Sequence, residues 1–327
     1  RNPPLPVPVG SGQGLEMMGD SMLNDGAGPG GQPSRFEALF RGPDGLRAGW
    51  SLLIFVAVGG AVTWAMIRGV LHFYHPPDGW TARSLIVAEL ISFLGAVAAV
   101  AVMAKIERRS FADYGFPWKR AFGGRFWEGA LWGIATIGAL VLAIAAAGGY
   151  TLSGLALHGA EALRSALLWG LAFLLVGLFE ELFFRAYPLF TLARGIGFWP
   201  GALLLSLLFG ALHYFTKPME TWLDALSVGL IGLFFCLTVR RTGDVWFAAG
   251  WHFAFNYGSM FACGSPNTGN DGLPIPGHLL AASFHGPQWL TGGPMGAEAS
   301  ALVFPVLAAL FAGFLWRFRE ARFPAPG

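Results

Sequence analysis

Long apolar runs separated by short polar breaks constrain this chain more than any other feature. A helix that crosses the hydrocarbon core of a bilayer needs about 20 mostly apolar residues. Only 12% of the 327 residues are charged, about half the share found in a soluble domain. We therefore predict an all-α, polytopic membrane bundle of about eight transmembrane helices. The expected spans are 48–73, 82–105, 125–148, 165–190, 197–215, 222–239, 245–263 and 299–317.

The chain divides into two parts by composition. Residues 1–45 are rich in Pro, Gly, Ser and Asn and have no apolar periodicity. Such a stretch cannot bury enough apolar surface to offset the loss of chain entropy on folding. We expect a flexible N-terminal tail over 1–45 and one transmembrane domain over 46–320, with the functional motifs in a core at 165–262.

Charge and cysteine content exclude several classes of protein. The formal net charge is only +2, and Lys and Arg lie at the ends of the apolar runs rather than in one basic stripe. A nucleic-acid partner is therefore not expected. Two cysteines, Cys236 and Cys263, cannot form a disulfide framework or a Cys-rich zinc site.

The distribution of Lys and Arg predicts the orientation in the membrane, because cytoplasmic loops are enriched in both. One set of span ends is rich in these residues and the other set is poor. Eight spans with both termini in the cytoplasm satisfy this bias. The basic ends carry Arg35, Arg41, Arg47, Lys105, Arg108, Arg109, Lys119, Arg120, Arg125, Arg240, Arg241, Arg317, Arg319 and Arg322.

Three ionisable residues lie in the fourth predicted span, whose sequence is LLWGLAFLLVGLFEELFFRAYPLF. An isolated charge at the centre of a membrane helix costs about 2.5–3.5 kcal/mol on insertion scales. Glu181 and Arg185 are four residues apart and share a helix face, in the favourable order for an ion pair. Glu180 points away from Arg185 and is free for chemistry. The alternative is a purely structural charge cluster that joins two helices.

Two further spans carry histidine. His213 is the main titratable group of the fifth span, with Phe209 one turn earlier on the same face. In the seventh span, His252 and Asn256 are four apart and therefore stand on one face. The alternative for each is a buried histidine or an interhelical polar contact without catalytic function. His213 lies near the far end of its short span, whereas we expect Glu180 and His252 nearer the cytoplasmic side.

If these groups converge, they supply a hydrolytic site in a cavity of low dielectric constant. A carboxylate with an imidazole activates water, while His and Asn N–H groups stabilise an oxyanion. One Glu and two His are also a known set of catalytic zinc ligands. The residue types alone leave both mechanisms open.

The three motifs together resemble the CPBP intramembrane proteases, which are related to the type II CAAX prenyl endopeptidase. The resemblance rests on Glu180-Glu181-x-x-x-Arg185, Phe209-x-x-x-His213 and His252-x-x-x-Asn256, in this order. It covers about 165–262, a little under a third of the chain. It implies an intramembrane endopeptidase with eight helices, located in a bacterial cell membrane and surrounded by lipid. The implied substrate is a peptide or a prenylated protein.

The resemblance also implies a role for each residue. Glu180 would activate water with the help of His213, and His252 and Asn256 would form the oxyanion site. Glu181, Arg185 and Phe209 would support them. If a metal such as zinc is present, Glu180, His213 and His252 would hold it. The neutral amide of Asn256 suits an oxyanion donor better than a zinc ligand and so favours the metal-free mechanism.

Two other functions stay open at this stage. The chain could be a non-proteolytic immunity or scaffold protein that retains the motif, or a proton-coupled transporter that uses Glu180 and the histidines as a relay. The Gly/Pro-rich segment 264–298 connects the last two spans on the side that is poor in Lys and Arg. It is either a functional lid or a disordered loop, and its His278 and His285 are expected to be solvated.

Overall fold

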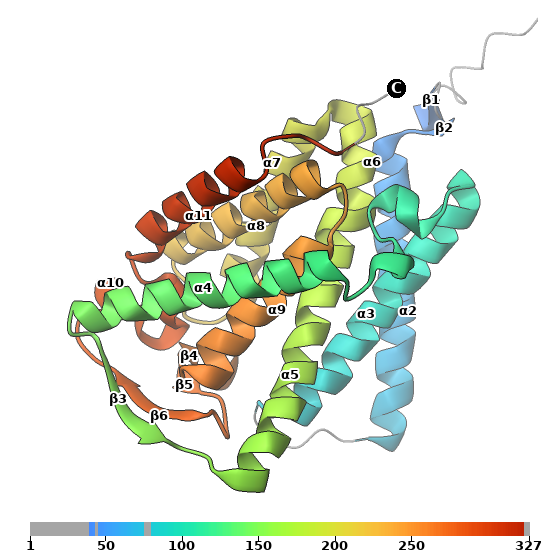
Figure 1. Ribbon diagram of the computed structural model, residues 1–327. Helices are drawn as coiled ribbons and strands as arrows, with labels where there is room; N and C mark the ends of the chain where they lie inside the picture. Colours follow the sequence, from blue (N-terminus) through green and yellow to red (C-terminus); the bar gives the residue numbers. More distant parts are fainter. Residues whose placement is uncertain (1–38, 43–44, 75–79, 324–327) are drawn as a thin grey trace, which may run out of the picture. The chain divides into compact units, whose positions relative to one another are not determined.

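The computed structural model describes residues 39–42, 45–74 and 80–323, and helices make up most of this part (Figure 1). All of the elements below belong to one compact unit, Phe40–Gly327. The α-helices are α2 (Ala48–Phe73), α3 (Ala82–Glu107), α4 (Gly124–Ala146), α5 (Gly159–Glu181), α6 (Tyr187–Ile196), α7 (Phe198–Thr216), α8 (Trp222–Thr242), α9 (Trp246–Asn256), α10 (Gln288–Thr291) and α11 (Val303–Arg317).

Short strands and tighter or wider helical turns complete the fold. The strands are β1 (Arg41–Gly42), β2 (Gly45–Leu46), β3 (Tyr150–Leu155), β4 (Pro266–Asn267), β5 (Leu273–Pro274) and β6 (Leu280–Phe284). The 3-10 helices are η1 (Phe111–Tyr114), η2 (Trp118–Arg120), η5 (Thr268–Asn270), η6 (Gly293–Met295) and η7 (Ala297–Ala299), and the π-helical turns are η3 (Leu182–Ala186) and η4 (Tyr257–Ala262).

The predicted class, an all-α polytopic membrane bundle, is confirmed. Within the described residues, six helices are long and apolar enough to cross a membrane: 48–73, 82–107, 124–146, 159–196, 198–216 and 222–242. These six match the first six predicted spans. Many of their large apolar side chains are exposed, as expected of a surface that faces lipid; examples are Leu53, Trp64, Leu131, Leu167 and Leu207.

The predicted count of eight spans is not reached by these criteria. The seventh predicted span forms α9 followed by η4, and the eighth forms α11, which has 15 residues. Both are apolar and helical but too short to count as full spans of a straight helix. The chain is nevertheless a multi-pass membrane protein on the six longer helices alone.

Glycines bring α9 against α4, and this contact fixes where the residues of α9 lie. A Cβ atom at Gly129 of α4 would meet the carbonyl oxygen of Phe247, and one at Gly133 would meet that of Trp251. From the other side, a Cβ atom at Gly250 would meet the carbonyl oxygen of Phe126. Small residues spaced in this way allow close backbone approach between membrane helices. The α4–α9 contact is the most extensive in the fold.

One π-helical turn overlaps the first polar motif, and another directly follows the third. The turn η3 begins one residue after Glu181 and contains Arg185, so α5, η3 and α6 form one continuous helical rod (Figure 1). The turn η4 begins one residue after Asn256. Such turns insert an extra residue into a helix, shift the face on which later side chains lie, and occur frequently at functional sites.

The segment 264–298 is folded rather than disordered. Its β6 pairs antiparallel with β3, from Tyr150 opposite Phe284 to Leu155 opposite Leu280, and its β4 pairs with β5. The predicted tail, 1–45, lies mostly outside the described residues; at its end, β1 pairs with β2. Figure 1 places β3 and β6 at the opposite end of this unit from β1, β2 and the end of α6.

Candidate active site

The four predicted catalytic residues lie on the wall of one cavity of about 190 Å³. Glu180 comes from the end of α5, His213 from the last turn of α7, and His252 and Asn256 from α9. Phe209 and Phe235 contribute apolar wall next to them. Three separate helices therefore bring a carboxylate, two imidazoles and an amide together in the middle of the bundle.

Glu181 and Arg185 lie behind this wall and form a fully buried ion pair. Arg185 Nη1 donates to Glu181 Oε1 at 3.3 Å, and both side chains are 0% exposed. The guanidinium lies over three aromatic rings, and the nearest of these, Phe209, has its centroid 4.2 Å away. Gly232 leaves the room for it, since a Cβ atom there would lie 2.7 Å from Arg185 Nη2. Cation–π contacts of this kind partly offset the cost of burying Arg185.

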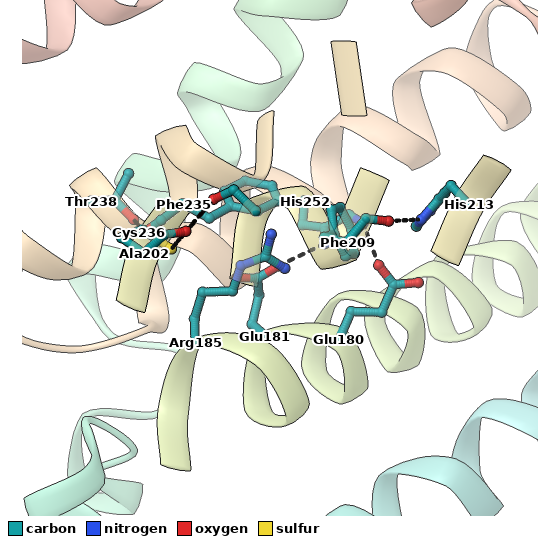
Figure 2. A network of polar contacts seen from close by, with 11 residues as sticks. Glu180, Glu181, Arg185, Ala202, Phe209, His213, Phe235, Cys236, Thr238 and His252 are labelled. Atoms are coloured by element: carbon teal, nitrogen blue, oxygen red, sulfur yellow. Dashed lines mark hydrogen bonds and ion pairs between the residues drawn. The ribbon is translucent and has the colours of Figure 1, made fainter. Parts of the chain in front are cut away.

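His252 lies between the two adjacent glutamates (Figure 2). Its Nδ1 donates to Glu181 Oε1 at 3.0 Å, and its Nε2 lies 3.6 Å from Glu180 Oε2. The ring also stacks on Phe235, with centroids 5.2 Å apart. Glu181 thus fixes the orientation of the imidazole, as carboxylates commonly do for functional histidines, and directs Nε2 toward Glu180.

His213 is held by its own helix. Its Nδ1 donates to the backbone carbonyl of Phe209 at 2.9 Å, and its ring packs against the Phe209 ring at 4.6 Å between centroids (Figure 2). Because Nδ1 carries the proton in this bond, Nε2 of the neutral ring is the unprotonated nitrogen. The predicted boundaries of this span agree with α7 to within one residue, so the position of His213 near the helix end is real. The cavity extends along the bundle as far as that end.

The two glutamates differ in their environment although they are neighbours in sequence. Glu181 accepts hydrogen bonds from Arg185 and His252 and is completely buried. Glu180 has a side chain that is 20% exposed and makes no hydrogen bond through its buried Oε2 atom within the described part of the chain. Glu180 is therefore the carboxylate that can reach a water molecule or a substrate in the cavity.

The donor types around the cavity suit zinc, but their arrangement does not. Glutamate and histidine side chains are ordinary zinc ligands, and both imidazoles have Nδ1 bonded to an orienting group, as zinc-bound histidines do. Across the residues that the structure describes, however, no three His, Cys, Asp or Glu side chains are grouped closely enough to hold a metal ion. The residues as placed do not fit the metal, and we derive no catalytic step through one.

The cavity also includes polar residues that the sequence analysis did not select. Glu89 of α3, the α7–α8 connection and the segment 264–298 all contribute to its wall. Glu89 lies inside the second predicted span, so the rule that singled out Glu180 would have identified it. The contribution of 264–298 depends on long-range packing that no local pattern shows. His278 and His285 lie outside the cavity wall; His278 Nδ1 donates to the Ile275 carbonyl at 2.9 Å.

Comparison with known families agrees with the resemblance found in the motifs. The family model described as "Type II CAAX prenyl endopeptidase Rce1-like" matches residues 162–258. This segment holds α5 to α9, and thus all four cavity residues named above. The match covers under a third of the chain and supports a CPBP/CAAX protease family assignment. Neither the curated proteins nor the solved structures gave a match.

Proposed function

We propose that this protein is an intramembrane endopeptidase in which Glu180 activates the attacking water. The observation that carries the proposal is the convergence of Glu180, His213, His252 and Asn256, from three helices, on one cavity. The family match supports a peptide-hydrolysing activity of this type. Ionisable groups inside a membrane protein are costly, and their grouping around a cavity favours a catalytic function over a structural one.

The proposed reaction uses each group at a stated atom. Glu180 takes a proton from a water molecule whose oxygen attacks the carbonyl carbon of the peptide, and the unprotonated Nε2 of His213 accepts a hydrogen bond from the same water. The Asn256 amide and the His252 imidazole donate to the oxyanion that forms. Glu180 then passes its proton to the leaving amine as the C–N bond breaks.

Glu181 and Arg185 act as positioning residues in this proposal. Glu181 Oε1 accepts from His252 Nδ1 at 3.0 Å, and Arg185 Nη1 donates to the same oxygen at 3.3 Å. Preorganised donors are more effective than mobile ones because they need no rearrangement when charge develops on the substrate. The buried ion pair therefore maintains the direction of the His252 ring.

We further propose that the cavity reaches the non-cytoplasmic face of a bacterial membrane. Its wall includes Lys217 and Glu220 at the α7–α8 connection and residues 267–269 of the segment 264–298. These lie at helix ends opposite to those that carry Lys105, Arg194, Arg240 and Arg317. The bias of Lys and Arg toward the cytoplasm favours the second set as cytoplasmic, with both termini on that side.

The proposed substrate is a polypeptide that enters from the lipid or from the end of the bundle where the α7–α8 connection lies. We call this the acidic end, and the end that carries Lys105, Arg194, Arg240 and Arg317 the basic end. The family description names a CAAX prenyl endopeptidase, so a prenylated peptide is the second substrate class to test. A prenylated cytoplasmic protein would approach from the basic end, whereas the cavity wall extends to the other end. This geometry favours an unmodified polypeptide.

The test is a cleavage assay with the purified protein in liposomes. A random-sequence peptide library and a farnesylated CAAX peptide are each incubated with wild type and with His252→Ala, and products are identified by mass spectrometry. We expect wild type to cleave library peptides and His252→Ala to cleave none. We also expect a chelator to leave the rate unchanged. Equal product from both proteins would overturn the assigned catalytic site. No product from wild type would overturn the protease function in favour of a binding protein.

A further inference from the structure

The cavity wall holds a second group of charged residues besides the four catalytic groups. It contains four acidic residues, which we call the acidic wall: Glu89, Glu220, Asp224 and Glu298. They come from α3, the α7–α8 connection, α8 and η7. Among the described residues, Lys217 is the one lysine or arginine on the cavity wall, and its side chain is exposed. Four carboxyl groups and one lysine share a cavity that is otherwise lined mainly by apolar and aromatic residues.

One of these four residues has a clear structural role, and three do not. Asp224 Oδ2 accepts from the Thr221 hydroxyl at 3.1 Å, and this pair caps the start of α8. Glu220 and Glu298 accept only long bonds from hydroxyl groups, at 3.4 Å from Thr268 and 3.3 Å from Ser259. Glu89 Oε2 is buried and has no hydrogen-bond partner among the residues that the structure describes. Within the described ranges, none of these three glutamates forms an ion pair.

Two unpaired hydrogen-bond donors line the same cavity and point independently to a ligand. Asn267 is 7% exposed, and its Nδ2 is buried without an acceptor. Trp251 is 1% exposed, and its Nε1 is likewise without an acceptor in the part of the chain that the structure describes. Buried donors are normally paired, and each unpaired one lowers the stability of the fold by roughly 1–3 kcal/mol. Peptide carbonyl groups are acceptors that a substrate chain would bring to this wall.

We propose that the acidic wall binds a positively charged side chain of the substrate, with Glu89, Glu220 and Glu298 as the recognising carboxylates. The inference rests on the proposed protease function and names the class of polypeptide that it takes: one with Lys or Arg close to the bond that is cleaved. Asn267 and Trp251 receive the backbone carbonyls of the same segment.

Electrostatics explains why a basic residue is selected. Carboxylates that are withdrawn from water and lack a cation are destabilised, and a cationic side chain in the cavity offsets this cost. A neutral side chain leaves them unpaired, and an acidic one adds repulsion. The specificity for a basic side chain therefore has two sources, attraction of Lys or Arg and repulsion of Asp or Glu.

Binding and cleavage are measured separately, so that the two proposals can fail independently. A random-sequence peptide library is incubated with Glu180→Gln protein in liposomes, and bound peptides are compared with unbound ones by mass spectrometry. We expect Lys- and Arg-containing peptides to be enriched roughly tenfold over Glu-containing ones, a typical effect of paired charges in a desolvated site. The same library with wild type then reports cleavage.

Three variants of the Glu180→Gln protein test the wall itself. Adding Glu89→Gln or Glu298→Gln should reduce the enrichment to roughly threefold or less. Adding Glu220→Lys should shift it toward acidic peptides, an outcome that a structural role of Glu220 would not produce. The matched control is Glu161→Gln, because Glu161 is exposed at the start of α5 and lies outside the cavity wall. It should leave the enrichment as it is.

Each result has a definite meaning. Enrichment of basic peptides that Glu220→Lys reverses supports the inference. No enrichment of basic over acidic peptides, or the same enrichment in Glu220→Lys, overturns it even if wild type cleaves peptides. Enrichment without any cleavage by wild type retains the binding wall and overturns the protease function.

Discussion

The two walls of the cavity differ in how their charged groups are paired. On the catalytic wall, Glu181, Arg185 and His252 form a connected network with distances of 3.0 and 3.3 Å. On the acidic wall, Glu89, Glu220 and Glu298 have no ion-pair partner in the described ranges. The catalytic wall holds a buried ion pair, although Glu181 Oε2, Arg185 Nε and Arg185 Nη2 have no hydrogen-bond partner among the described residues. The three glutamates of the acidic wall have no cationic partner there. We infer that the first holds catalytic geometry and that the second contributes to substrate choice.

This contrast predicts different consequences for stability. Removal of one member of a buried ion pair leaves an uncompensated charge and costs about 3–5 kcal/mol. Arg185→Leu should therefore strongly destabilise the protein, because Glu181 stays buried. Glu89→Gln should leave stability unchanged or raise it. The substitution replaces a buried carboxyl group, which has no ion-pair partner in the described ranges, with a neutral amide. Thermal unfolding in detergent measures both, and an equal loss in the two variants would contradict the contrast.

Activity should distinguish His213 from its neighbour on the same helix. His213→Ala removes the imidazole proposed to bind the attacking water, and we expect a loss of about 10²–10⁴-fold in kcat. Tyr214→Phe is the control, because Tyr214 is 43% exposed and lines an outer apolar surface instead. It should retain the wild-type rate. Unfolding temperatures close to wild type in both variants would show that the difference is chemical.

The acidic wall also predicts a pH-dependent preference among substrates. Burial raises the pKa of Glu220 to about 7 and that of Glu298 to about 7. Lys217 lowers both pKa values and Asp224 raises both, and the charge of Glu220 further raises the pKa of Glu298. Glu89 and His213 are further titratable groups on the wall of the same cavity. Above pH 7 the two carboxyls are ionised and attract a basic side chain, and below pH 7 they become neutral.

The measured quantity is the ratio of kcat/KM for a cleaved peptide that contains Lys to that for the same peptide with Gln. Titration of the catalytic groups affects both peptides and cancels in the ratio. We expect the ratio to rise several-fold between about pH 6 and pH 8, given two carboxyls that titrate near 7. In the Glu220→Gln, Glu298→Gln double variant the ratio should be flat. A flat ratio in wild type would remove these residues from substrate recognition.

Much of the fold was predictable because long apolar runs admit few alternatives in a bilayer. The first six spans agree with the helices of the structure, and the boundaries of α7 agree within one residue. Helix geometry also indicated that Glu181 and Arg185 share a face, and the structure pairs them at 3.3 Å. The turn η3 was not predictable, because a π-helical turn depends on tertiary packing rather than on local sequence.

The site was predictable only in part. The motif residues could be identified from the sequence because ionisable groups inside apolar spans are rare. Glu89 meets the same criterion but was not among the predicted site residues. The bond from Glu181 to His252 joins residues 71 apart, and the acidic wall joins α3 to the segment 264–298. Neither contact leaves a local pattern. The first depends on the packing of α5 against α9, where a Cβ atom at Gly177 would meet the α9 backbone, and the second depends on the folded connection between α9 and α11.

The most direct test of the account compares Glu180→Gln with wild type in liposomes, using one cleaved peptide, kcat as the readout and the unfolding temperature as the control. Because Glu180 makes no hydrogen bond through its buried oxygen, the change should leave stability intact. We predict a loss in kcat of at least about 10³-fold, within the range expected when a general base is removed. A folded Glu180→Gln protein that turns over at the wild-type rate would contradict the assignment of Glu180 as the base.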